Sequence, residues 1–80
     1  MTSPAQIRAA RHLANLSQAD IAKATGLSLP TIKRVESDRE VSVSEDAQVA
    51  VCRALEAAGV EFTNGDQPGV RLRKGADARR

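Results

Sequence analysis

The chain has 80 residues, with Phe62 as its single aromatic residue and Cys52 as its single cysteine. A chain of this length forms one small domain, and a core of Ala, Val, Ile and Leu without Trp or Tyr suits closely packed helices better than a sandwich of sheets. One cysteine excludes an internal disulfide, the spacing of a Cys/His zinc site is missing, and no apolar run approaches a signal or membrane segment. We therefore expect a cytoplasmic protein that uses no metal or other cofactor and does not contact membranes.

The net charge of +2 is unevenly distributed along the chain. Residues 1–65 carry seven Lys and Arg against eight Asp and Glu, whereas residues 66–80 carry five against two. A basic end is compatible with nucleic-acid binding, but a solvated terminus that only keeps the protein soluble would have the same composition. We expect residues 1–74 to form one domain and residues 75–80 to form a disordered basic tail.

The first predicted helix covers residues 4–14. Ser3 is a favourable cap, Pro4 is suited to the first helical position, and Gln6 stands three residues after the cap, as in a capping box. Apolar residues then recur at helical spacing, and Asn15 can adopt the left-handed conformation that ends the helix.

Two further helices are predicted close together. Ser17 caps the first of them, Asp20 follows three residues later near its positive end, and Gly26 stops it. Ser28 caps the next helix only two residues after that glycine. Pro30 lies in its first turn, where the missing N–H would have had no helical partner, so the proline is compatible with a helix start.

A fourth and longest helix is predicted between Ser44, its cap, and Gly59, its stop. The apolar period then changes from helical to two, and the turn signals Asn-Gly-Asp and Pro-Gly interrupt it, which predicts a β-hairpin over residues 60–73. A two-stranded ribbon is unstable alone, so its apolar residues Phe62 and Leu72 should pack on the helices, near Leu13 and Leu55.

The segment ATGLS, residues 24–28, joins two of these helices in the manner of a helix-turn-helix motif, because the glycine permits a sharp turn and Leu27 fills the corner. The longer stretch IRAARHLANLSQADIAKATGLSLPTIKRVES resembles the phage-repressor, or XRE, type of helix-turn-helix regulator over about residues 6–58. The ending EAAGVEFTNGDQPGVRLRK is similar to that of many small bacterial XRE proteins. The resemblance implies a mainly α fold, a compact four-helix lambda-repressor-like helix-turn-helix domain with a C-terminal β-hairpin.

The resemblance also implies roles for three polar residues. Gln18 matches the glutamine that braces the recognition helix and contacts backbone phosphate, and both roles stay open for it. Arg11 and Glu36 match an arginine and a glutamate that pair between the first and third helices. Because a charge turned inward needs a partner, we interpret these two as a structural ion pair rather than as DNA contacts.

The third predicted helix has two different faces. At about 100° per residue, Ile32 and Val35 fall on one side of the helix. The other side carries Leu29, Pro30, Lys33, Arg34 and Ser37. Lys33 and Arg34 can donate to guanine O6 and N7, although two cations on a solvated helix could also serve solubility alone. The predicted DNA-binding residues are Gln18, Ser28, Leu29, Pro30, Thr31, Lys33, Arg34, Ser37 and Arg39.

Two of these assignments carry a qualification from their neighbours. Leu29 and Pro30 stand where a recognition helix often has amide side chains, so we expect contacts with thymine methyl groups rather than strong adenine recognition. Arg39 is a phosphate-binding candidate, but Asp38 and Glu40 flank it and lower the local positive potential.

A second type of surface is predicted on the fourth helix. With Glu45 at zero, Val49 and Cys52 fall near about 40° and 340°, on the face that carries the charged residues. One exposed apolar residue is ordinary, whereas two neighbours on a small domain indicate a contact surface. Cys52 is interpreted as a small buried or half-buried thiol rather than a nucleophile or redox sensor, since His12 is the only histidine and no catalytic group of residues is visible.

The residues of the predicted protein interface are Val49, Cys52, Phe62 and Leu72, because the outer strand of the hairpin could also pair with another chain. The sequence predicts no enzyme but a regulator that binds double-stranded operator DNA as a homodimer, which would supply two recognition helices for two half-sites. The alternative is a protein-binding antiactivator or antitoxin-like module that uses the same scaffold to capture another regulator.

Overall fold

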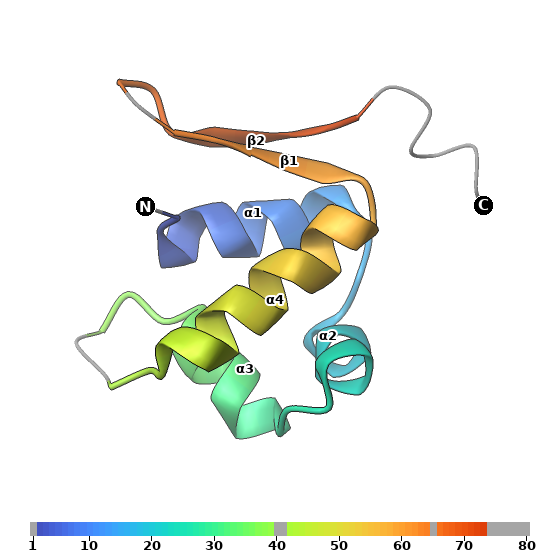
Figure 1. The fold of residues 1–80 in the computed structure, drawn as a ribbon, viewed down its shortest axis with the longest axis vertical. Helices are drawn as coiled ribbons and strands as arrows, with labels where there is room; N and C mark the ends of the chain where they lie inside the picture. Colours follow the sequence, from blue (N-terminus) through green and yellow to red (C-terminus); the bar gives the residue numbers. More distant parts are fainter. Residues whose placement is uncertain (1, 40–41, 65, 74–80) are drawn as a thin grey trace.

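The computed structural model describes residues 2–39, 42–64 and 66–73, and the predicted tail at 75–80 lies outside these ranges. Four helices are followed by an antiparallel pair of strands, which confirms the predicted mainly α fold with its C-terminal hairpin (Figure 1). The elements are α1 (Pro4–Leu13), α2 (Gln18–Thr25), α3 (Leu29–Val35), α4 (Glu45–Ala57), β1 (Val60–Thr63) and β2 (Gly69–Leu72). In Figure 1, α4 crosses the front of the molecule, with α3 on one side of it and the hairpin on the other.

The start of α1 is the predicted capping box. The Ser3 hydroxyl accepts from the Gln6 N–H at 3.2 Å, and the Ser3 N–H donates to Gln6 Oε1 at 2.9 Å. The helix ends at Leu13, one residue before the predicted end, because Ala14 is the C-cap. Asn15 then has a φ of 59°, the left-handed conformation predicted for it.

The helices α2 and α4 begin and end at the predicted caps and glycines, and α3 begins after its predicted cap, Ser28. Ser17 and Asp20 form a second reciprocal cap, with bonds of 3.0 and 2.8 Å. Gly26 ends α2 in the left-handed region, with a φ of 75° that most side chains rarely adopt. Ser44 caps α4, and Gly59, with a φ of 102°, follows its C-cap.

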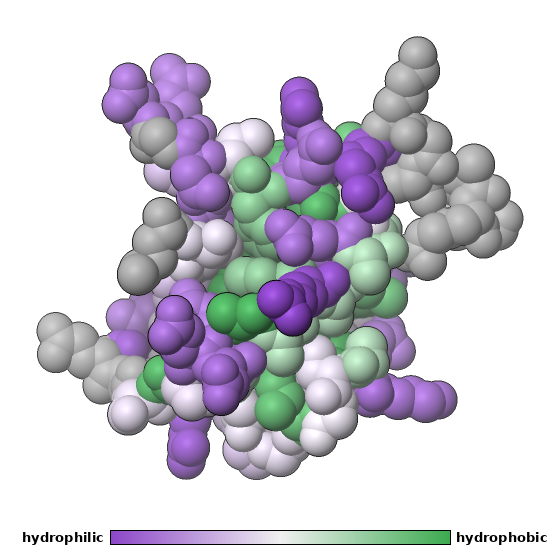
Figure 2. All heavy atoms as spheres, in the orientation of Figure 1, coloured by the Kyte–Doolittle hydropathy of each residue, from purple (hydrophilic) through white to green (hydrophobic). Residues whose placement is uncertain are grey.

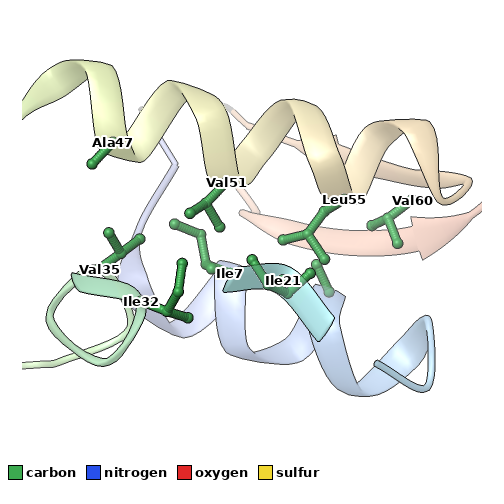
Figure 3. Close-up of a cluster of buried hydrophobic side chains, with 9 residues drawn as sticks. Ile7, Ile21, Ile32, Val35, Ala47, Val51, Leu55 and Val60 are labelled. Carbon is green, nitrogen blue, oxygen red and sulfur yellow. The ribbon is translucent and has the colours of Figure 1, made fainter. Parts of the chain in front are cut away.

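The core lies between α4 and the three shorter helices. Figure 3 shows the side chains of α4 directed toward those of α1, α2 and α3, which come from segments far apart in the sequence. The buried apolar residues are Ile7, Ala10, Ile21, Ile32, Val35, Ala47, Val51, Leu55 and Val60.

No described helix is long and apolar enough to cross a membrane.

The hairpin is fixed to the helices by apolar packing and by one buried amide. Phe62 pairs with Val70 across the strands, and both pack against the core. The Gln6 Nε2 donates to the carbonyl oxygens of Thr63 at 2.9 Å and Gly69 at 3.1 Å, so the glutamine of the α1 capping box also holds the hairpin at its turn end. Of the two leucines expected beside the hairpin, Leu55 is fully buried in the core, whereas Leu13 is 41% exposed.

Candidate nucleic-acid interface

The two faces of α3 differ as the helical periodicity predicts. Ile32 is fully buried and Val35 is 3% exposed, so these two side chains anchor the helix on the core. On the other side, Leu29 is 39% exposed, and Lys33 and Arg34 are exposed as well. The cationic side chains are therefore presented to solvent by a helix that is fixed along its opposite side.

The first turn of α3 uses its hydroxyl groups locally. The Ser28 Oγ accepts from the Thr31 N–H at 3.3 Å and lies 2.8 Å from Thr31 Oγ1. Pro30, in the first turn, is exposed and has no N–H to satisfy. Ser28 and Thr31 thus determine where the helix starts, whereas Leu29 and Pro30 offer apolar surface beside the cations.

A buried polar network holds the end of α3 to the rest of the motif. The Glu36 carboxylate, 3% exposed, accepts from Arg11 Nε at 2.7 Å and from Arg11 Nη2 at 3.1 Å. Gln18 Nε2 donates to the same carboxylate at 3.1 Å, and Arg11 Nη1 donates to the Leu16 carbonyl at 3.1 Å. The network therefore links four segments, α1, the loop after it, α2 and the end of α3, with Arg11 and Gln18 in direct contact with the carboxylate.

For Gln18 this geometry shows one of the two roles left open by the sequence, the bracing of α3. Its side-chain amide braces α3 through Glu36. The side chain is half-buried at the first position of α2, so part of it still reaches the surface. The bracing contact is direct, and contact with a phosphate is an additional proposal.

Arg8 makes contacts beside the candidate interface that the sequence did not predict. It forms two bonds of 3.1 Å with the Asp38 carboxylate and donates through Nη1 to the Glu36 carbonyl. The spacing of Arg8 and Arg11, one helical turn apart, was the available signal, since it places both cations on the same side of α1. Because the charge of Asp38 is paired with Arg8, it lowers the positive potential at Arg39 less than the sequence predicts.

Arg39 and Ser37 lie in the loop that follows α3. Arg39 is exposed, and its N–H donates to the Ser37 hydroxyl at 3.1 Å, which shapes the turn. The loop and the end of α3 border a groove of about 180 Å³ beside the start of α4. The groove brings three predicted DNA-binding residues together, and it is lined by Pro4, Arg34, Val35, Ser37, Arg39, Val43 and Gln48.

The predicted protein-binding residues lie on two separate surfaces. Val49 is 39% exposed and Cys52 is half-buried on the outer side of α4. Partial burial, and secondarily the charge of Glu56, raise the pKa of the Cys52 thiol, which disfavours the reactive thiolate at neutral pH. Phe62 and Leu72 pack against the core of their own domain, as Cys52 also does, so the hairpin offers a partner mainly its strand edges and its polar outer face.

The comparisons with known proteins agree with this architecture. The family described as "Helix-turn-helix domain" matches residues 5–63, from the first turn of α1 to the end of β1. The chain therefore belongs to the helix-turn-helix domain family. Comparison with curated proteins gave no match. Within the described ranges, no cluster of three or more His, Cys, Asp or Glu side chains could hold a metal ion.

Proposed function

We propose that the chain is a cytoplasmic transcription regulator of the XRE type, which binds operator DNA in a sequence-specific manner as a homodimer. The observation that carries the proposal is the position of Lys33 and Arg34, exposed on a helix whose other side is buried. A recognition helix needs both properties, because its side chains reach base edges only if the helix is held rigidly at the protein surface. The buried contacts of Glu36 supply this rigidity.

Each exposed residue of α3 has a chemical role in this proposal. Arg34 and Lys33 donate to guanine O6 and N7, and Leu29 and Pro30 contact thymine methyl groups in the major groove. Arg39 contacts a backbone phosphate, a contact that fixes the register of the protein but carries no base specificity. The local potential at Arg39 is more favourable than the sequence alone suggests, because Arg8 pairs with Asp38.

The proposal is tested by selecting binding sites from a random duplex library with the full chain and then titrating the selected duplex by fluorescence anisotropy. Arg34→Ala should weaken binding by about 1–3 kcal/mol and relax the preference at one base pair of each half-site. Binding should also weaken steeply with salt, since cations that neutralise phosphates release condensed counterions.

The control variant is Arg71→Ala. Arg71 is also an exposed arginine, but it lies on the hairpin, on the opposite side of α4 from α3 (Figure 1), and pairs with Glu61. We expect this variant to bind the selected duplex within about twofold of the wild-type protein. Binding that is insensitive to salt and to sequence, and unchanged by Arg34→Ala, would contradict the proposal.

A second candidate function is favoured by one specific observation, the exposed Val49 on α4. An antiactivator or antitoxin-like module would use that side of the scaffold to capture another regulator. For this function Val49→Asp should abolish regulation, because it places a charge in an apolar contact, whereas Lys33→Ala and Arg34→Ala should leave regulation intact.

A further inference from the structure

The outer side of α4 combines apolar and charged groups in a regular order. Glu45, Val49 and Arg53 follow one another at intervals of four residues, so they form one stripe along the helix. Val49 is 39% exposed, and the stripe borders a groove of about 320 Å³ that Cys52 and Thr2 also line. Figure 2 shows this side of the molecule, where hydrophobic atoms over α4 are bordered by hydrophilic side chains.

The order of charges in the stripe is self-complementary. If two copies of α4 pack antiparallel around a twofold axis at Val49, a residue n positions after Val49 faces the residue n positions before it on the other copy. Arg53 then faces Glu45 of the second copy, and the same pair occurs twice by symmetry. Among the described residues, neither Glu45 nor Arg53 forms an ion pair within its own chain. Both charges are therefore available for the second copy.

We propose that this stripe is the surface on which a second copy of the chain docks, with Val49 on the twofold axis and two Arg53–Glu45 pairs beside it. The inference rests on the proposed function, for which it supplies the dimer. A twofold axis perpendicular to α4 is consistent with binding one DNA molecule. Because α3 and the hairpin lie on opposite sides of α4 (Figure 1), rotation about this axis keeps both copies of α3 on the same side.

The hairpin is a less favourable place for the second copy. Antiparallel pairing of β2 with its own copy, centred on Arg71 or Leu72, would place Arg71 opposite Arg71 or Arg73 of the other chain. Like charges directly opposite each other on a sheet are destabilising. In addition, the apolar side chains of the hairpin are already packed against the core. The α4 stripe has neither disadvantage.

Cross-linking of the full-length protein tests the register. In Val49→Cys/Cys52→Ala the new thiol lies on the axis, so mild oxidation should produce a covalent dimer. In the wild-type protein the two Cys52 Cα atoms would be offset by six residues, about 9 Å along the helix, which exceeds the distance that a disulfide spans. The matched control is Glu56→Cys/Cys52→Ala, an exposed thiol on the same helix but far from the axis. We expect the first variant to cross-link at least ten times faster than either of the others.

Charge reversal tests the pairing by sedimentation equilibrium. Arg53→Glu should raise the dissociation constant of the dimer roughly tenfold, since two surface pairs become repulsive. Glu45→Arg/Arg53→Glu should restore it, and Glu56→Arg should leave it unchanged. Circular dichroism verifies that each variant is folded.

Several results would overturn the inference without deciding whether the chain binds operator DNA. A dimer that is indifferent to these substitutions would have its interface elsewhere, and equal cross-linking through Cys52 would mean a different register. A chain that stays monomeric and does not cross-link through position 49 would overturn both the inference and the homodimer of the proposed function. Loss of specific DNA binding, in contrast, would refute the proposed function even if cross-linking succeeds.

Discussion

Replacement of Arg11 by methionine should destabilise the domain more than any other single charge removal on α1. Met keeps most of the aliphatic volume of the side chain but leaves the Glu36 carboxylate, 3% exposed, with Gln18 as its remaining side-chain partner. Removing one partner of a buried pair typically costs about 3–5 kcal/mol, because the other charge stays buried without compensation. A domain of this size has a total stability of about 4–12 kcal/mol, so the loss would be a large fraction of the free energy of unfolding.

The assay is urea unfolding followed by far-UV circular dichroism, and Arg8→Met is the control. Arg8 has the same side chain on the same helix, but its partner Asp38 is 72% exposed, and it also donates to the Glu36 carbonyl. We expect the control to lose about 1–2 kcal/mol, from an exposed pair and one hydrogen bond. The double variant Arg11→Met/Glu36→Leu should recover part of the loss, since no charge is then left buried. Equal losses for Arg8→Met and Arg11→Met would refute this reasoning.

Three further predictions concern other parts of the domain. Gln6→Leu should lower the free energy of unfolding by about 1–3 kcal/mol in the same assay, because the carbonyl oxygens of Thr63 and Gly69 lose their donor. An unchanged urea midpoint would contradict the role of Gln6 in holding the hairpin. Gly26→Ala should cost about 1–2 kcal/mol, measured as a lower thermal midpoint, since a Cβ at this φ is strained even though no atom lies within 4 Å of it. Because the pKa of Cys52 is raised, less thiolate is present at any given pH, and alkylation of Cys52 by iodoacetamide should require a higher pH than alkylation of free cysteine. Glu56→Gln should move this pH profile of alkylation to lower pH. A wild-type profile like that of free cysteine would be inconsistent with this environment.

The fold was largely predictable because its boundaries are encoded locally. Ser3, Ser17 and Gly26 act on residues within one turn of themselves, so the caps and stops follow from short sequence windows. The buried sides of α3 and α4 followed from helical periodicity for the same reason.

The polar contacts that position the site could be predicted less well from the sequence. Gln6 bonds to Thr63, 57 residues away, and Arg8 bonds to Asp38, 30 residues away. Spacing along the chain carries no information about such pairs. The contact between Arg11 and Glu36 was expected only from the resemblance to a known family, since nothing in local spacing relates two residues 25 positions apart.

The central claim, that the exposed side of α3 contacts base edges in the major groove, is tested most directly by methylation interference on the selected duplex. Methylation of guanine N7 blocks an acceptor that is accessible only in the major groove. We predict that wild-type protein is excluded by methylation of at least one guanine in each half-site, and that Arg34→Ala becomes insensitive to one of these positions. Interference that is absent, or that remains identical in Arg34→Ala and Lys33→Ala, would contradict the claim, because it would show that the cations of α3 do not contact guanine.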